Sequence, residues 1–136
     1  MLELRFGAMR EETITVGHEN AITFLGQDGP RVLSTPHMIG YMERTCRNLA
    51  LSMLEPGHDT VGTHVNVSHC AAAPMGAVVT FHAELASAEK NRMNFKVSAR
   101  SGETIIGQGE HQRAIVNVKS FASRVAEARN KDETRK

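Results

Sequence analysis

The spacing of hydrophobic positions changes along the chain between a helical period and a strand period. Residues 38–54 repeat apolar side chains every three to four positions, as one face of a helix does. Other segments alternate apolar and polar residues or are rich in β-formers, which is typical of strands. These segments are residues 11–16, 61–70, 78–86, 93–100 and 104–118. Short turns separate the last four, so we predict that they are antiparallel neighbours.

The predicted helix has a recognisable signal at each end. A hydroxyl residue before proline is typical of a helix start, so we place Thr35 at the N-cap and Pro36 at the first helical position. The helix should run to about Leu54, because residues 55–57 (Glu-Pro-Gly) stop it. One strand, one long helix and four antiparallel strands predict an α+β fold with the helix packed on one face of the sheet.

Length and composition predict a single globular domain over residues 1–136, with 40% hydrophobic and 23% charged residues. The formal net charge is +1, but residues 119–136 hold six basic and three acidic side chains. We expect this charged segment to be a short helix or a frayed tail. The remainder is close to neutral and only 4% of residues are aromatic, so we predict no nucleic-acid partner.

The chain also lacks the marks of a membrane or secreted protein. Residues 1–6 carry charges within a short apolar run, and no stretch approaches the roughly 18 apolar residues of a membrane span. Two cysteines, Cys46 and Cys70, cannot form a disulfide framework. We therefore predict a cytoplasmic protein with reduced thiols and no membrane partner.

One acidic residue lies at the edge of the face that the helical pattern buries. At 100° per residue, that face is formed mainly by Met38, Met42, Leu49 and Met53. Glu43 falls on its flank, whereas the basic residues of the helix avoid it. A carboxylate that loses hydration there suits a general base or acid. Two structural alternatives stay open, in which Glu43 reaches out to solvent or pairs with Arg47 one turn later.

Thr35 and His69 likewise allow a structural and a functional interpretation. Threonine before proline is normally a cap, but a helix N-terminus also offers free N–H groups to a developing oxyanion. His69 follows Val65 and Val67 on one face of its predicted strand, where a histidine is either simply hydrogen-bonded or catalytic. The pattern does not distinguish among the histidines His18, His37, His58, His82 and His111.

Several common active-site motifs are missing. His64 and His69 lie five residues apart in a strand, hence on opposite faces, and no cluster has zinc spacing, so we predict no metal site. Residues 107–109 (Gly-Gln-Gly) lie inside a strand pattern and indicate a bulge or bend rather than a phosphate loop. No GxSxG elbow is present. Cys46 lies in the apolar arc and is expected in the core.

Four segments together match one family. They are residues 35–43 (TPHMIGYME), 54–57 (LEPG), 61–69 (VGTHVNVSH) and 107–113 (GQGEHQR). Over about residues 8–121, the chain resembles the fluoroacetyl-CoA thioesterase group of hot-dog-fold proteins. The specific part of the resemblance is the spacing of Thr35, Glu43 and His69 across helix start, helix and second strand.

This resemblance implies a fold, an assembly and a reaction. The fold would be a hot dog, in which a curved antiparallel sheet of about five strands wraps one long helix. The protein would be a homodimer with active sites at the subunit interface. It would be an acyl-CoA thioesterase that hydrolyses a small acyl-CoA to free acid and CoA. No metal or cofactor would take part, since CoA belongs to the substrate.

The resemblance also implies roles for five residues. Thr35, Glu43 and His69 would be catalytic: Glu43 as base or nucleophile, Thr35 to orient the water or attack directly, and His69 to polarise the carbonyl or protonate the thiolate. Gly62 and Arg113 would bind substrate, and backbone N–H groups near the helix start or around Gly62 would complete an oxyanion hole.

The acyl group and two other functions stay open. Residues 26–33 contain no Phe, whereas the fluoroacetyl-specific members are more aromatic here, so we expect a small acyl group without naming it. Other hot-dog proteins are acyl-thioester dehydratases or hydratases, and others bind acyl-CoA or a metabolite without catalysis.

Overall fold

The computed structural model describes residues 4–26 and 30–135, which form a five-stranded antiparallel sheet and two helices. In chain order the elements are β1 (Met9–Thr15), α1 (Thr35–Leu51), β2 (His58–His69), β3 (Val78–Glu89), β4 (Arg92–Ser101), β5 (Thr104–Asn117) and α2 (Val118–Arg135). The strand order is β1-β3-β4-β5-β2, so the two strands that flank α1 in sequence form opposite edges of the sheet. Residues 27–29 of the polar segment before α1 lie outside the described residues.

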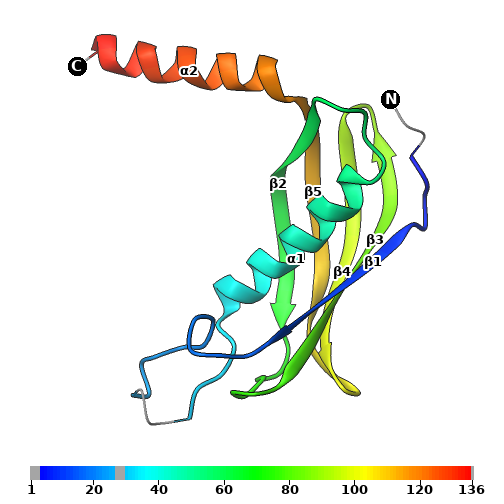
Figure 1. Ribbon diagram of the computed structural model, residues 1–136, viewed down its shortest axis with the longest axis vertical. Coiled ribbons are helices and arrows are strands. Elements are labelled where there is room, and N and C mark those ends of the chain that lie inside the picture. Colours follow the sequence, from blue (N-terminus) through cyan, green and yellow to red (C-terminus); the bar gives the residue numbers. More distant parts are fainter. Residues whose placement is uncertain (1–3, 27–29, 136) are drawn as a thin grey trace.

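The sheet curves around α1, which crosses its concave face diagonally (Figure 1). Three irregularities in strand pairing accompany the curvature. They lie between Gly62 and His64, between Leu85 and Ser87, and between Ala99 and Arg100. An extra residue in one strand of a pair bends that strand and increases its twist. The predicted α+β arrangement, with one long helix on one face of the sheet, is confirmed.

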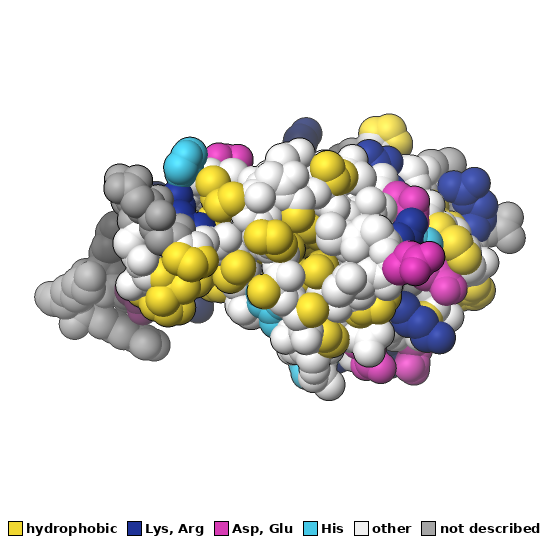
Figure 2. All heavy atoms as spheres, turned by 90° about the horizontal axis from the view of Figure 1, so that it is seen from below, with side chains coloured by type: hydrophobic (Ala, Val, Ile, Leu, Met, Phe, Trp, Pro, Cys, Tyr) yellow, Lys and Arg dark blue, Asp and Glu magenta, His cyan; other side chains and the backbone are white. Residues whose placement is uncertain are grey.

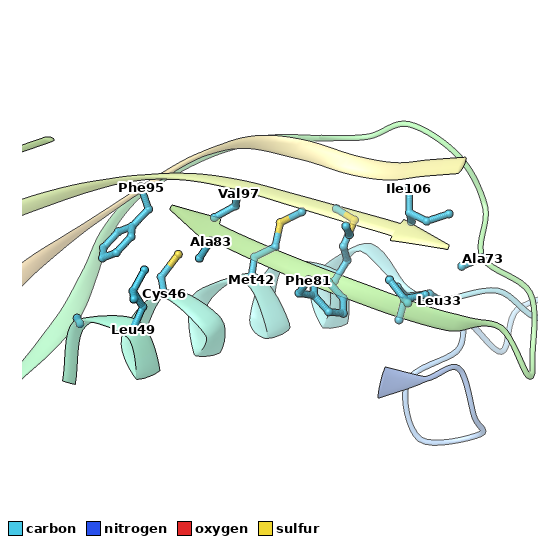
Figure 3. Packing of buried hydrophobic residues seen from close by; sticks show 14 of the residues in the cluster. Leu33, Met42, Cys46, Leu49, Ala73, Phe81, Ala83, Phe95, Val97 and Ile106 are labelled. Carbon is cyan, nitrogen blue, oxygen red and sulfur yellow. The ribbon is translucent and has the colours of Figure 1, made fainter. Parts of the chain in front are cut away.

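The hydrophobic core fills the space between α1 and the concave face. β3 and β4 bury every second residue, as their alternating sequences predict: Val79, Phe81, Ala83 and Leu85, then Met93, Phe95, Val97 and Ala99. Figure 3 shows Met42, Cys46 and Leu49 of α1 pointing into this space. Cys46 is fully buried, as predicted, and burial raises the pKa of its thiol to about 12.

The N-cap of α1 is Ser34 and not Thr35, which corrects the prediction by one residue. Ser34 has an extended backbone, and its hydroxyl accepts a hydrogen bond from the His37 N–H at 3.2 Å. Thr35 and Pro36 therefore occupy the first two helical positions. As a result, the Thr35 hydroxyl is not needed to cap the helix.

Other boundaries also differ from the predictions. α1 ends at Leu51 rather than Leu54. Ser52 is its C-cap, and the Ser52 hydroxyl donates to the Leu49 carbonyl at 2.6 Å. β2 begins at His58, three residues before the predicted start. The charged C-terminal segment forms the 18-residue helix α2, which extends away from the sheet (Figure 1). Neither α1 nor α2, as described, is long and apolar enough to cross a membrane.

The glycines at positions 107 and 109 lie where other backbone and side-chain atoms approach β5 closely. A Cβ on Gly107 would lie 2.6 Å from Met38 Sδ and 2.9 Å from the Ser68 carbonyl oxygen. A Cβ on Gly109 would collide with the Asn66 carbonyl. The β4–β5 pairing shifts at Ile106, so the irregularity predicted for residues 107–109 lies one residue before them.

Candidate active site

The end of β2 brings His69 to the start of α1, where it meets Thr35. Thr35 Oγ1 and His69 Nδ1 are 2.7 Å apart, which is a hydrogen bond between residues 34 positions apart in sequence. Thr35 is exposed and His69 is half-buried. The second ring nitrogen of His69, Nε2, is buried and has no hydrogen-bond partner among the described residues. The pair therefore combines an accessible hydroxyl with a histidine in direct contact.

Glu43 lies two turns further along α1 and is half-buried, as its predicted place on the flank indicated. The alternative in which it pairs with Arg47 is wrong, because Arg47 donates to Asp59 at 3.0 and 2.7 Å. Within the described ranges, no hydrogen bond or ion pair engages the Glu43 carboxylate. Its oxygens are therefore free to act on a bound molecule.

Gly62 of β2 faces Glu43 and two residues of β5. A Cβ built on Gly62 would lie 3.7 Å from Glu43 Oε1, 3.5 Å from Arg113 Nη1 and 3.2 Å from His111 Cε1. The pairing of β2 with β5 explains the proximity, since Gly62 lies opposite Arg113 in the sheet. Three of the five predicted site residues, Glu43, Gly62 and Arg113, thus lie together.

Arg113 is buried and held by three acceptors. Its Nε donates to Thr60 Oγ1 at 2.6 Å, its Nη2 to the Thr60 carbonyl at 2.9 Å, and its Nη1 to His111 Nε2 at 3.0 Å. The other ring nitrogen of His111 donates to the carbonyl of His64 at 2.8 Å. Arg113 is only 5% exposed, so it lies behind the surface that Gly62 and Glu43 present.

Burial sets the protonation of this network. Burial lowers the pKa of His111, and the neighbouring Arg113 cation lowers it further, against the opposing effects of the His64 carbonyl and Glu43. Burial also lowers the pKa of Arg113, although a guanidinium stays protonated in proteins. The network therefore contains one neutral imidazole and one buried cation near the Glu43 carboxylate.

The five predicted residues form two groups within one chain. Thr35 and Glu43 are eight residues apart on α1, which separates their backbones by about 12 Å along the helix axis. His69 and Gly62 are seven residues apart on β2, at about 3.3 Å per residue. One group is therefore Thr35 with His69, and the other is Glu43 with Gly62 and Arg113.

His111 and Thr60 are the residues of this region that sequence reasoning missed. Alternation in the last predicted strand places His111 and Arg113 on the same face as the two glycines at 107 and 109. Two polar side chains on a strand face that otherwise carries glycines were the sequence feature that could have indicated a buried polar site. Their partner on β2, Thr60, depended on strand pairing that no local pattern specifies.

The start of α1 and the end of β2, the two segment ends that meet in this pair, lie in the lower half of Figure 1. Seen from that end, hydrophobic side chains gather across the middle of the surface and charged side chains gather toward one side (Figure 2). Exposed hydrophobic residues of the segments at this end are Phe24, Leu25, Met75, Val78 and Ile105.

This arrangement of one long helix in a curved antiparallel sheet is the hot-dog fold. A solved hot-dog-like protein from Thermanaerovibrio acidaminovorans superposes with a TM-score of 0.82, covering 90% of this chain and 91% of that one at 23% identity. Together with the hydroxyl–histidine pair, the family match that follows places the chain among the hot-dog thioesterases.

The chain belongs to the fluoroacetyl-CoA-specific thioesterase family, whose profile matches residues 16–119. It is 42% identical over 96 residues to a fluoroacetyl-CoA thioesterase of Streptantibioticus cattleyicolor, covering 71% of this chain and 69% of that protein. A solved structure of the fluoroacetyl-CoA thioesterase FlK has a TM-score of 0.83 at 33% identity, covering 92% and 97% of the two chains. A variant of FlK solved with fluoroacetate and CoA has a TM-score of 0.78 at 35% identity, over 87% and 99%.

Proposed function

We propose that this protein hydrolyses the thioester of a small acyl-CoA to the free acid and CoA. The observation that carries the proposal is the 2.7 Å contact between Thr35 Oγ1 and His69 Nδ1 in a member of a thioesterase family. A hydroxyl within hydrogen-bond reach of a histidine is the arrangement of a nucleophile with its base.

In the first half of the proposed reaction, Thr35 attacks the carbonyl carbon of the thioester. Its proton passes to His69 Nδ1 as the new carbon–oxygen bond forms. The carbon–sulfur bond then breaks, and His69 returns the proton to the departing thiolate of CoA. The acyl group is left as an ester on Thr35.

In the second half, Glu43 activates the water that hydrolyses this ester. Its carboxylate is half-buried and not engaged by another described side chain, so it accepts the proton of the attacking water. The bond between the acyl carbon and Thr35 Oγ1 breaks, and Glu43 gives the proton that it took from water to Thr35 Oγ1, so both side chains return to their starting state. Every transfer is assigned to a side chain, so the proposed reaction needs neither a metal nor a cofactor.

We assign Gly62 and Arg113 to substrate binding. A glycine at position 62 keeps the space beside Glu43 open for the reacting group, and backbone N–H groups around it suit the developing oxyanion. Arg113 is buried behind this space, so we propose that it acts on the substrate through its positive charge rather than through direct contact.

We further propose that the active protein is a homodimer paired through β2. This strand is an edge of the sheet, is 12 residues long, and exposes residues 62–66. An edge strand of this length presents a row of unpaired backbone groups that a second strand can bond. In a twofold dimer the same strand from each subunit would pair antiparallel.

Such pairing would bring the two groups of site residues together. They lie near opposite ends of β2, and antiparallel pairing places the end of one strand beside the beginning of the other. With the twofold axis near Val65, His69 and Thr35 would face Glu43 of the partner subunit. We therefore propose that each active site takes Thr35 and His69 from one protomer and Glu43 from the other.

The first test is thiol release from a panel of acyl-CoAs, with wild type beside Glu43→Gln. The panel contains acetyl-, fluoroacetyl-, malonyl-, phenylacetyl-, crotonyl- and palmitoyl-CoA. We expect wild type to release CoA from at least one small acyl group, and Glu43→Gln to lower kcat at least about 100-fold through loss of the base. Loss of enoyl absorbance from crotonyl-CoA without free thiol would indicate a hydratase instead. Binding of CoA without any thiol release would contradict hydrolysis.

We also propose a cytoplasmic location. The thiols of Cys46 and Cys70 are both free. Reduced thiols are the usual state of cysteine in the cytoplasm. Cell fractionation of the native host measures the location, and recovery of the protein from an oxidising compartment would contradict this proposal.

A further inference from the structure

A buried polar network lies directly behind Glu43 and Gly62, and the proposed reaction leaves part of it unused. His111 is 1% exposed and contacts Arg113 on one side and the backbone of β2 on the other. A buried polar side chain is costly to retain unless its hydrogen bonds are satisfied, and both ring nitrogens of His111 have partners. The role of this histidine therefore needs an explanation.

The partners of His111 determine where its proton lies. Nδ1 faces the His64 carbonyl, which can only accept, so Nδ1 carries the proton. Nε2 faces Arg113 Nη1, which can only donate, so Nε2 carries none. The imidazole is therefore neutral and acts as an acceptor for the arginine.

Each nitrogen of the Arg113 guanidinium has its own acceptor. Thr60 accepts the hydrogen bonds of Nε and Nη2. Nη1 is the nitrogen 3.5 Å from the Cβ position of Gly62, and its acceptor is His111. His111 thus holds the part of the cation that lies nearest to Gly62.

We infer that His111 is a positioning residue, which holds the Arg113 cation in place beside Glu43 and Gly62. The inference rests on the proposed function of Glu43 as a catalytic base. A buried cation near a carboxylate keeps that carboxylate charged and oriented only while the cation itself stays in place. Both ring nitrogens of His111 are bonded to Arg113 and to the backbone of β2, so neither is left to bond a substrate.

The other charged and titratable groups around the network fit this assignment. Glu43, Cys46 and Arg47 approach from α1, and Asp59 and His64 from β2. Asp59 is already paired with Arg47, and the Cys46 thiol stays protonated because burial raises its pKa to about 12. Glu43 is therefore the carboxylate left for the Arg113 charge to act on.

Two substitutions at one position test the inference. His111→Phe keeps the ring volume and removes the acceptor for Arg113, whereas His111→Gln keeps an oxygen that can accept the Nη1 proton. We expect His111→Phe to lower kcat about tenfold or more, with KM changed less than about twofold, and His111→Gln to recover most of kcat. His82→Phe is the matched control, since His82 bonds Glu11 on a different part of the sheet and should keep wild-type kcat.

The outcomes separate positioning from a structural role and from failure of the proposed function. Wild-type kcat in His111→Phe, or equal losses in both variants that follow their Tm, would overturn the inference. An inactive wild type would instead overturn the proposed function.

If His111→Phe does not fold, nitrogen-15 NMR of the His111 imidazole in the wild-type protein tests the inference instead. We expect protonated Nδ1, unprotonated Nε2 and no titration near the ordinary histidine pKa of about 6.5. The opposite tautomer, or ordinary titration, would overturn the inference.

Discussion

The Thr35 hydroxyl is able to bond His69 because Ser34, and not Thr35, caps the N-terminus of α1. A capping hydroxyl bonds a backbone N–H of the first helical turn, as Ser34 does with His37. One position further on, Thr35 belongs to the helix, and its side chain is directed to the neighbouring strand instead. A shift of one residue in the cap thus separates a structural hydroxyl from the candidate nucleophile.

At the residue scale we also predict that Gly109 is required for stability. Gly109→Ala places a methyl group against the Asn66 carbonyl of β2, so the strand must move. We expect a loss of about 2–3 kcal/mol in the free energy of unfolding, measured by denaturant titration. Gly40→Ala is the control, because that helical position has open space and alanine should stabilise it by about 0.5–1 kcal/mol. Unchanged stability in Gly109→Ala would contradict this packing.

At the scale of the elements, one carboxylate joins β1 to α1. Glu12 of β1 accepts hydrogen bonds from Arg10 at 2.7 Å, Arg44 at 3.1 Å and Asn48 at 2.8 Å. Arg44 and Asn48 belong to α1 and lie one turn apart. The first strand is thus tied to the same helix that carries Thr35 and Glu43.

This contact predicts a pH-dependent contribution to stability. Burial alone would raise the pKa of Glu12, but hydrogen bonds from Asn48, Arg10 and Arg44 outweigh it and hold the pKa below its usual value of 4.5. Because the folded-state pKa is depressed, the stabilisation is present above about pH 4.5 and disappears as pH falls through the folded value.

We expect Glu12→Gln to lower the free energy of unfolding by about 1 kcal/mol at neutral pH and by less in acid. Urea titrations at several pH values measure the difference, with Glu103→Gln in the exposed β4–β5 turn as the control. A difference that stays constant with pH would contradict the assignment.

At the scale of the whole molecule, the proposed pairing of two subunits through the edge strand β2 decides whether the two groups of site residues meet. Thr35 and His69 lie at one end of this strand, and Glu43 lies beside Gly62 nearer its start. A site that needs both groups is incomplete in one chain, and the proposed antiparallel dimer would complete it. Activity should therefore require the dimer, and a variant that stays monomeric should be inactive.

Mixing two inactive variants tests whether the site is shared. Thr35→Ala and Glu43→Gln are each expected to be inactive as homodimers. After denaturation and refolding together, half of the dimers are mixed, and each mixed dimer holds one intact site of two, so about a quarter of wild-type activity should return. No recovery, with mixed dimers shown by mass spectrometry, would place Glu43 and Thr35 in the same protomer's site.

Local patterns were sufficient to predict most of the elements. Strand alternation and the helical face are properties of neighbouring residues, so β3, β4, β5 and α1 were found within a few residues of their bounds. The place of Glu43 on the flank of α1 also followed from helix geometry alone. The exact ends of α1 were missed because they depend on Ser34 and Ser52, which bond backbone groups at the two ends of the helix. The hydrophobic pattern does not show which neighbouring residue does so.

The sequence by itself determined an α+β chain with one buried helix, a family resemblance and the identities of Thr35, Glu43 and His69 as candidates. Only the tertiary structure decided which of them touch. The Thr35–His69 contact, the position of Gly62 opposite Arg113 and the hydrogen bonds of His111 all depend on how β2 pairs with β5 and lies against α1. Strand register and helix packing are set by contacts between residues far apart in the chain, and local periodicity carries no information about them.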